Sequence, residues 1–484
     1  MKLSWHERVS LSANDGEVVV SGPRSRLALR RLSAEVVDAM RRLTPPGEDA
    51  DLLSETVMTS GGSGSLAHWL YCLEELDQRG LVRKTLFAGD RPLATVVPLG
   101  RPVTVPNGRA TSHGLHTRYH LSRFAYLRRD EDQMVLESPL AHAKIVMHDA
   151  RGVALVAALA AKSSLADLEH LELLPSDALR RLVALLAETQ IIDRADEDPN
   201  RTDSSPLDTW EFHDLLFHSR SRRGRSDAPF GATFRFAQRP PPPAIKSVVG
   251  PPLRQPSPGG SGRSDALFRP DLRQLERDDP PLALVQERRR SVREYATQPV
   301  TDRQLGEFLY RVARVKERRQ VQMPTASGNV AVELATRPYP AGGALYELEF
   351  YVAVRNCRGL ESGLHYYDPL EHRLLAMDAD RRATHALLDE AAASAGIEPA
   401  TVQVLIVLAA RFERLAWKYQ SIAYALTLKH VGVVYQTMYL AATAMGLAPC
   451  ALGCGDSEVF ARASGNAYCT ETSVGEFLLG SRAS

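Results

Sequence analysis

The 484-residue sequence predicts an α+β protein with two winged-helix-like units in its N-terminal half and, in its C-terminal half, a mixed sheet flanked by helices. Three observations predict this. A stretch rich in Pro, Gly and Ser between positions 237 and 279 cannot bury a core and separates the halves. The N-terminal half repeats one order of elements. The C-terminal half contains the apolar strand 402–410 and the long apolar helix 426–445. We therefore predict domains at 1–110 and 111–200, a helix plus linker at 201–280, and a further domain at 281–484.

The repeated order in the N-terminal half consists of two helices followed by a short apolar strand, which is typical of winged helices. Ser33 and Ser176 each precede an apolar periodic run and are predicted N-caps. A Gly/Ser-rich stretch interrupts the first unit before its second helix. The pattern predicts helices at 33–43, 67–80, 153–161 and 176–190, and strands at 81–87, 143–149 and 191–193.

Winged helices often bind DNA, but the charges here argue against that function. The predicted recognition helix 67–80 is net acidic and helix 176–190 is about neutral, whereas a phosphate footprint requires basic residues. We favour recognition of a peptide or protein over a purely structural scaffold, and both over DNA binding.

The overall composition excludes further classes of function. Lys and Arg number 59 against 58 Asp and Glu, so a net charge of +1 gives no general attraction to nucleic acid or to an anionic membrane. No window approaches the roughly 20 apolar residues that span a bilayer, and the N-terminus lacks a signal-peptide core. The five cysteines are too few for a disulfide framework. We expect a cytoplasmic protein with neither nucleic acid nor membrane as partner.

Residues 207–236 combine an apolar helical stripe with a basic cluster. We interpret the stripe as core and the cluster as a solvated or subunit-contact patch, although an anionic ligand stays open. The stripe comprises Trp210, Phe212, Leu215, Leu216 and Phe217, and the cluster Arg220, Arg222, Arg223 and Arg225.

Three histidines, His113, His116 and His120, lie close together in the sequence and raise the question of a metal site. Gly114 and the turn at 106–108 place them in a loop, and no Cys, Asp or Glu completes a ligand set nearby. We predict no metal.

The C-terminal half opens with Arg289, Ser291 and Arg293, which alternate so that two guanidiniums and a hydroxyl can meet one anion. A basic surface run is the equal alternative from these residues alone. Thr301 then caps a predicted amphipathic helix at 302–312.

Several motifs in order give this half a specific resemblance. RRSVR at 289–293, PVT at 299–301, RPYPAGGALYELEFYVAV at 337–354 and GLHYYDP at 363–369 resemble the nitroreductase-like flavoproteins. Together with WEFHDLLFHSRSRRGR, AWKYQSIAYALTLKHVG and MYLAATAMGLAPCALGCGD, they resemble the SagB-type and cyanobactin-oxidase-type dehydrogenases. This resemblance implies an FMN enzyme that oxidises azolines (thiazoline or oxazoline) to azoles in a ribosomally made, modified peptide.

The resemblance also assigns the cofactor residues. Arg289, Ser291 and Arg293 match the first flavin motif, and Pro340, Ala341 and Gly342 match the turn against the isoalloxazine, although the family pattern has Ser at 341. Leu452 and Gly453 lie in the stretch whose counterpart offers N–H groups near flavin N5. Arg482 matches the C-terminal clamp on the FMN phosphate.

Lys418 and Tyr419 occupy the place of this family's acid–base pair. Azoline oxidation removes a proton from the ring carbon α to the backbone carbonyl and a hydride from the neighbouring carbon. A lysine pKa near 10.4 must be depressed for this work, by burial or by cations such as Arg411 or Arg414. No GxGxxG nicotinamide fingerprint is present, so dioxygen is the expected electron acceptor.

The expected partners are a heterocyclised precursor peptide, a second copy of the chain bound through helix 426–445, and a cyclodehydratase. The alternative function is that of a nitro- or quinone-reductase-like flavin enzyme acting on a small molecule, which gives no reason for the N-terminal half. A non-catalytic scaffold is a third reading, and the intact Arg289, Ser291 and Arg293 argue against it.

Overall fold

A computed structural model describes residues 1–14, 17–22, 25–99, 117–195, 206–226, 228–247 and 264–483. The chain forms two compact units, Met1–Ala228 and Pro229–Ser484, which are described separately. Helices and strands build both units, which confirms the α+β class.

One antiparallel sheet of seven strands runs through the first unit, in the order β5-β1-β6-β7-β11-β10-β9. β7 pairs with β11, so that Val96 faces Ile145 and the two winged-helix-like halves share a continuous sheet. The strands are β1 (Lys2–Trp5), β5 (Glu48–Asp49), β6 (Val82–Ala88), β7 (Arg91–Pro98), β9 (Tyr126–Asp130), β10 (Gln133–Glu137) and β11 (Ala143–Met147).

Two small sheets complete this unit. One consists of β2 (Ser10–Asn14), β3 (Glu17–Ser21) and β4 (Arg26–Arg30), and the other of β12 (Ser163–Ser164), β8 (Arg118–Leu121) and β13 (Ile192–Arg194). The helices are α1 (Ala34–Arg42), α2 (Ala50–Gln78), α3 (Ala150–Ala158), α4 (Leu165–Glu169) and α5 (Ser176–Glu188).

The predicted helices are present, but three details differ from expectation. The Gly/Ser-rich interruption is a kink at Gly62, where φ is +71°, inside the long helix α2. Ser33 holds the N-cap position of α1, but its hydroxyl lies 3.2 Å from that of Ser65 and bonds no helix N–H. Ser176 is the first residue of α5, and Pro175 precedes it as the cap. Local sequence therefore located these helices better than their ends.

Helix α6 (Phe212–Arg220) carries the start of the basic cluster, and side chains fasten it to β9 and β10. Arg220 pairs with the buried Glu137 at 2.6 Å and donates to the Tyr126 hydroxyl at 2.7 Å. Arg225 donates to the carbonyl of Leu140 at 2.9 Å. Two of the four arginines are thus structural. The expected apolar core stripe is wrong for Phe212 and Phe217, which are each 37% exposed, because α6 buries little beyond Ser219.

The second unit contains a seven-stranded sheet in the order β15-β20-β19-β18-β21-β24-β23. Every pairing in it is antiparallel, so the sheet is not mixed as predicted. The strands are β15 (Ser264–Ala266), β18 (Leu348–Val354), β19 (Gly363–Asp368), β20 (Arg373–Ala376), β21 (Val404–Arg411), β23 (Leu447–Ala451) and β24 (Glu471–Ser481).

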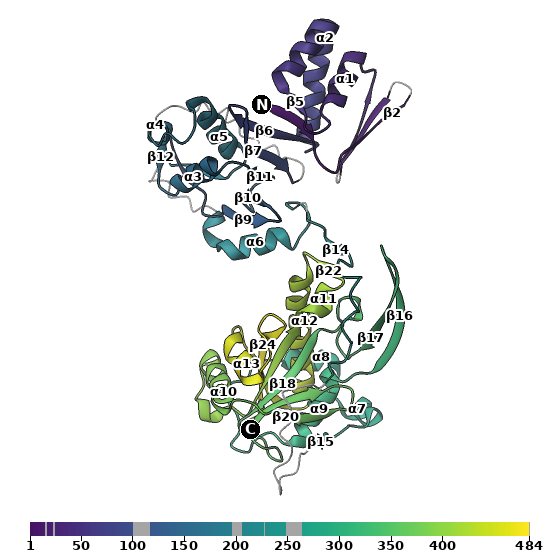
Figure 1. The fold of residues 1–484 in the computed structure, drawn as a ribbon. Helices are drawn as coiled ribbons and strands as arrows, with labels where there is room; N and C mark the ends of the chain where they lie inside the picture. The colour runs from purple at the N-terminus through teal and green to yellow at the C-terminus, as the bar shows by residue number, and fades with distance from the viewer. Residues whose placement is uncertain are drawn as a thin grey trace. The chain divides into compact units, whose positions relative to one another are not determined.

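Helices cover both faces of this sheet, in the green and yellow part of Figure 1. Phe350 and Ile406 point to the core shared with α9 (Asp302–Ala313) and α12 (Ala423–Ala444). Tyr351 and Val407, one residue on, point to the core with α10 (Arg381–Ala395) and α13 (Ser457–Ser464). This alternation explains why β18 and β21 are apolar on consecutive residues. Thr301 is the N-cap of α9, as predicted, and forms a capping box with Gln304.

Smaller elements surround the sheet. They are α7 (Leu272–Asp278), α8 (Leu282–Arg288), α11 (Phe412–Ala416), the hairpin β16 (Glu317–Thr325) and β17 (Gly328–Thr336), and the short pair β14 (Gly231–Ala232) and β22 (Tyr419–Gln420).

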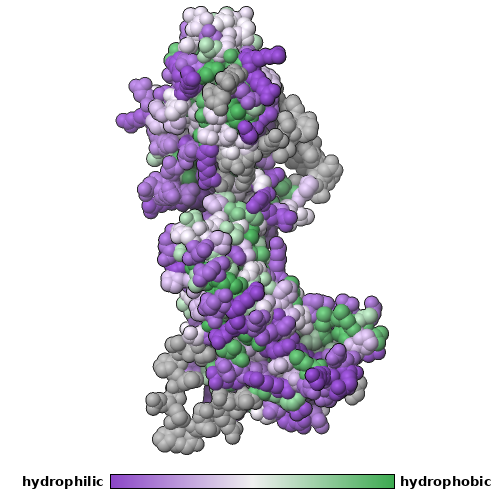
Figure 2. Space-filling view, turned by 90° about the vertical axis from the view of Figure 1, so that its right-hand side faces the viewer, coloured by the Kyte–Doolittle hydropathy of each residue, from purple (hydrophilic) through white to green (hydrophobic). Residues whose placement is uncertain are grey.

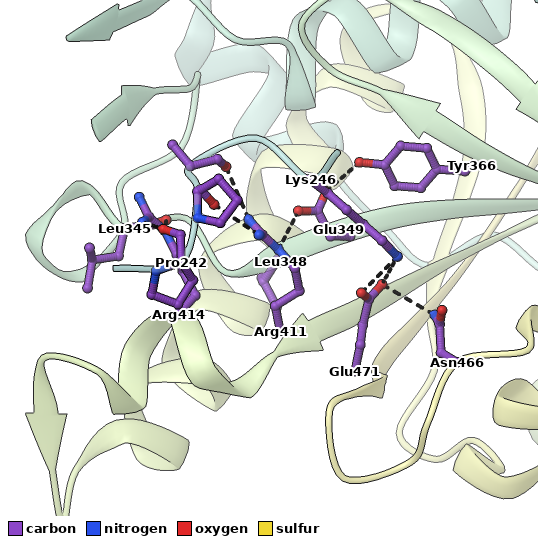
Figure 3. A network of polar contacts seen from close by, with 12 residues as sticks. Pro242, Lys246, Leu345, Leu348, Glu349, Tyr366, Arg411, Arg414, Asn466 and Glu471 are labelled. Carbon is purple, nitrogen blue, oxygen red and sulfur yellow. Dashed lines mark hydrogen bonds and ion pairs between the residues drawn. The ribbon is translucent and has the colours of Figure 1, made fainter. Parts of the chain in front are cut away.

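Residues 229–247, which we call the connector, belong to the second unit, and Figure 3 shows Pro242 and Lys246 of this segment among the side chains that bind it. Arg411 donates to the carbonyls of Pro243 and Ala244 at 2.9 and 3.1 Å. Arg414 donates to the carbonyls of Pro242 and Leu345. The two compact units therefore divide at 228/229, inside the predicted helix-plus-linker segment 201–280, because Arg411 and Arg414 bind the carbonyls of a segment that lacks apolar periodicity.

A buried ionic cluster lies beside these arginines. Glu349 pairs with Arg411 at 2.8 Å and accepts from the Tyr366 hydroxyl at 2.9 Å. Lys246, farther along the connector, pairs with Glu471 at 2.8 Å. Charged partners at the centre of the unit thus hold the connector at two points.

The surface carries hydrophilic side chains with hydrophobic ones among them, as is usual for a globular protein. On the face drawn in Figure 2, hydrophilic residues spread over both units and hydrophobic side chains gather in small patches. Within the described ranges, no helix combines the length and apolar character needed to cross a bilayer.

Candidate active site

Helix α12 is the element around which the predicted site residues gather. Three of its polar side chains bind neighbouring segments. His430 binds Gly342, whereas Tyr435 and Tyr439 bind the adjacent residues Leu452 and Ala451. At 1.5 Å per residue, His430 and Tyr439 stand about 13 Å apart along the axis. One end of this row holds the turn 340–343, and the other end holds the RRSVR segment.

His430 binds the turn through a buried dyad. Its Nε2 accepts the N–H of Gly342 at 2.8 Å, so the ring proton is on Nδ1, which donates to Glu347 at 2.7 Å. The Glu347 side chain is fully buried. The Gly342 N–H is therefore occupied, and a cofactor would meet other atoms of this turn.

Lys418 and Tyr419 reach the same turn at Gly343. A Cβ built on Gly343 would lie 2.8 Å from the Tyr419 hydroxyl and 2.9 Å from Lys418 Nζ, and φ of Gly343 is +63°. The positive φ favours glycine, and any Cβ here would displace the ends of both side chains. The structure thus brings the predicted acid–base pair against the predicted cofactor turn.

Burial changes the pKa of both members of this pair. Desolvation lowers the pKa of Lys418 and raises that of Tyr419. Of the two expected causes, burial lowers the lysine pKa, whereas the guanidiniums of Arg411 and Arg414 bind connector carbonyls instead.

The RRSVR segment lies at the other end of the row. The Ser291 hydroxyl is 2.7 Å from that of Tyr439, which accepts the N–H of Ala451 at 2.9 Å. The guanidinium of Arg289 lies 5.2 Å from the centre of the Tyr439 ring. The backbone of Arg482 forms an isolated antiparallel β-bridge with that of Tyr295, which lies two residues beyond Arg293. Segments 289–295, 450–453 and 480–482 therefore meet here.

The residues present fit an FMN phosphate. Arg289, Arg293 and Arg482 form no ion pair with any residue in the described ranges, and three such guanidiniums suit a dianion. Nothing lies within 4 Å of a Cβ built on Gly453, so the backbone there is open to a flat group. The N–H of Leu452 donates to the backbone carbonyl of Glu476 at 2.9 Å, so the Gly453 N–H is the member of this pair left to donate to a cofactor.

Pro340 and Ala341 play no polar side-chain part. Pro340 is exposed, and Ala341 packs at the margin of the core. Neither residue contacts the arginines through an ion pair or hydrogen bond, so the turn contributes backbone, as the loss of the family's Ser implied.

Sequence reasoning missed His430, Glu347 and Tyr439. The available signal was an ionisable residue next to or inside an apolar run, since Glu347 directly precedes LEFYVAV and His430 lies inside an apolar helix. Such residues are rarely buried without a partner.

Metal ligands do not cluster in the part of the chain that can be described, where no group of three or more His, Cys, Asp or Glu could hold an ion. His113 and His116 lie outside the described residues, and His120 lies in β8. The prediction of no metal stays a prediction.

Three sequence families match successive parts of the chain. The helix-turn-helix domain of cyanobactin oxidase matches residues 1–105, cyanobactin oxidase ThcOx matches 119–227, and the nitroreductase family matches 287–471. A putative nitroreductase of Methanocaldococcus jannaschii is 31% identical over 184 residues, which is 38% of this chain and 81% of that protein. The chain belongs to the nitroreductase family. This nitroreductase-family protein is an oxidoreductase, and its N-terminal half is similar to cyanobactin oxidase.

Solved structures related to this nitroreductase-family chain are distant. A putative nitroreductase of Ralstonia eutropha has 20% identity and a TM-score of 0.34, covering 51% of this chain and all of that one. The Escherichia coli microcin synthetase complex with a truncated precursor bound has 18% identity and a TM-score of 0.33, covering 56% and 91%. A putative nitroreductase of Desulfovibrio desulfuricans in complex with FMN has 17% identity and a TM-score of 0.26, covering 43% and 88%.

Proposed function

We propose that this protein is an FMN-dependent dehydrogenase that oxidises azolines to azoles in a modified peptide. The observation that carries the proposal is the convergence of Lys418 and Tyr419 on Gly343, in a chain whose N-terminal half is of the cyanobactin-oxidase type. A nitro- or quinone-reductase that acts on a small molecule would need neither this pair of residues nor the N-terminal half.

The residues divide into two tasks. Arg289, Ser291, Arg293 and Arg482 would hold the phosphate, while the turn at 340–342 and the 452–453 backbone would border the ring. FMN, when bound, supplies a two-electron acceptor for the hydride. The chain itself must then bind the azoline and remove its proton.

Lys418 is the proposed base. Its amine can take the proton from the carbon α to the backbone carbonyl only when it is deprotonated, and burial favours that form. Tyr419 keeps its proton at neutral pH because burial raises its pKa, so its hydroxyl can donate a hydrogen bond that orients the ring.

The substrate and partners follow from the same proposal. A heterocyclised precursor peptide is the substrate, the two N-terminal winged-helix-like units at 1–110 and 111–200 recognise peptide or protein, and a cyclodehydratase supplies the azoline. The cellular site is the cytoplasm and dioxygen is the acceptor.

A homodimer through α12 is part of the proposal. Tyr424 and Leu428 are 48% and 41% exposed, and Gly432 and Gln436 continue their line at intervals of four residues. This stripe is the surface that a second copy would cover. Tyr439 is not part of it, because its hydroxyl is bound inside the unit.

The decisive experiment incubates purified, FMN-loaded protein with a thiazoline-containing peptide in air. Loss of two hydrogens per ring, followed by mass spectrometry, is the expected result. Turnover of a nitroarene but never of an azoline would instead favour the small-molecule reductase.

A further inference from the structure

Residues 231–239 belong to the connector and precede the nitroreductase match, which begins at 287. They nevertheless pair with the acid–base segment. In the two-stranded sheet of β14 and β22, Ala232 lies opposite Tyr419 and Gly231 opposite Gln420. A segment outside the catalytic family's own match therefore forms one wall of the candidate site.

Hydrogen bonds continue this pairing on both sides. The N–H of Phe234 donates to the carbonyl of Lys418 at 3.1 Å. The indole of Trp417 donates to the carbonyl of Arg239 at 3.1 Å. The Ser421 hydroxyl donates to the carbonyl of Pro229 at 2.9 Å. Residues 417–421 are thus bound to the connector along their length.

The side chain of Phe234 covers the lysine. Its ring packs edge-to-face on Trp417 with centroids 5.6 Å apart, and Lys418 Nζ lies 5.6 Å from the ring centre. Phe234 also has a φ of +53°, which a bulky residue seldom adopts. Surrounding contacts hold this strained backbone in place, and such strain gathers at functional sites.

We propose that Phe234 is a positioning residue for Lys418, which excludes water from the amine and fixes it at the Gly343 turn. The inference rests on the proposed function of Lys418 as a base. It gives the connector a role in catalysis beyond joining the two halves of the chain.

The Phe234 ring has two opposing effects on the pKa of Lys418, and their balance decides how that pKa changes when the ring is removed. A ring face near a cation favours the charged lysine, but at 5.6 Å this contact is near the limit of about 6 Å and is worth little at a partly exposed site. Exclusion of water favours the neutral lysine and is the cause of its lowered pKa. Loss of the ring should therefore raise the pKa of Lys418.

The test compares Phe234→Ala with Phe236→Ala in the full chain. Phe236 lies two residues along the same segment and its ring meets Arg235 and Arg239, at 4.4 and 5.0 Å, and not the lysine. The pKa of Lys418 is measured on flavin-free protein from the pH dependence of its labelling by an amine-reactive reagent, with peptide mass spectrometry as the readout.

We expect the pKa of Lys418 to rise in Phe234→Ala, to stay unchanged in Phe236→Ala, and to return in Phe234→Leu, which restores apolar cover. In the loaded enzyme, kcat at neutral pH should fall about tenfold for each unit of that rise, with KM little changed. An unchanged or lower pKa in Phe234→Ala overturns the proposal. Because labelling needs no azoline, failure of the proposed function would leave this result intact and would show itself only as absent turnover in the wild type.

Should Phe234→Ala fail to fold, Phe234→Asn replaces it, because asparagine adopts a positive φ readily and gives the amine no apolar cover. The pKa of Lys418 should rise in Phe234→Asn, and an unchanged pKa in a variant that a thermal melt shows to be folded would overturn the proposal. Phe234→Tyr keeps the ring and should label as the wild type does. A shift in Phe234→Tyr would contradict the proposal.

Discussion

The hydroxyls of Ser291 and Tyr439 lie 2.7 Å apart, and the Tyr439 oxygen also accepts the N–H of Ala451 at 2.9 Å. One phenol therefore joins the RRSVR segment, helix α12 and the 450–453 stretch. Three segments distant in the sequence are fixed to each other before any cofactor binds.

Tyr439→Phe should therefore weaken FMN binding and lower the free energy of unfolding by about 1–3 kcal/mol, because the Ala451 N–H loses its acceptor. Urea titration of flavin-free protein and FMN titration measure the two effects. Tyr367→Phe is the control, since Tyr367 bonds His372 at 2.8 Å elsewhere in the core. It should lose stability and keep FMN affinity; equal FMN affinity in both variants would contradict the prediction.

Arg289→Ala should lose FMN and, with it, activity, because one of the unpaired guanidiniums near the predicted phosphate site is gone. Added FMN should restore part of the activity. Absorbance of the bound flavin after gel filtration is the measurement. Arg290→Ala is the matched control, because this neighbouring residue is exposed and lies outside the motif's alternation. Full flavin retention by Arg289→Ala would refute the phosphate assignment.

Lys418→Ala and Tyr419→Phe should keep FMN and the fold yet lose azoline oxidation. Removal of a general base costs about 10²–10⁴-fold in rate. The assay follows loss of two hydrogens per azoline ring alongside flavin absorbance. If Lys418→Ala oxidises azolines at the wild-type rate, the acid–base assignment is wrong and the pair has only a structural role.

The pH dependence of kcat/KM should show one ascending limb that belongs to Lys418. The base works only when deprotonated, so activity rises with pH through its pKa and then levels off. Because burial lowers that pKa, the rise should end below the ordinary lysine range near 10.5. A pH–rate profile between about 6 and 10 tests this. A profile that still climbs at the top of this range would show that the amine is not depressed in solution.

Leu428→Asp should convert the proposed dimer to monomer, because it puts a charge into the exposed stripe of α12. Leu70→Asp is the control, since Leu70 is similarly exposed, at 49% against 41% for Leu428, but lies in the first unit. Sedimentation at micromolar concentration distinguishes the two states. A monomeric wild type would end the dimer proposal.

Local signals predicted the elements well. Strand 402–410 corresponds to β21, helix 426–445 to α12, and helix 302–312 to α9 with Thr301 as its cap. Apolar runs and capping residues are patterns of residues close together in the sequence, so a single sequence is enough to find them.

Long-range partners could not be predicted in the same way. Nothing near Pro242 in the sequence indicates that Arg414 binds its carbonyl, and nothing near Gly342 indicates His430. The Lys418–Tyr419 assignment came from the family resemblance, and Phe234 belongs to no motif. Pairings across 80 or more residues depend on the complete fold, which a pattern within one window does not contain.

The pairing of β7 with β11 has a practical consequence for protein engineering. Since Val96 and Ile145 face each other across this seam, cutting the chain between the two winged-helix-like halves would leave each fragment with a bare strand edge that invites aggregation. Chimaeras that graft the specificity of one relative onto another should therefore exchange the N-terminal region whole, with the crossover placed at the junction after Ala228.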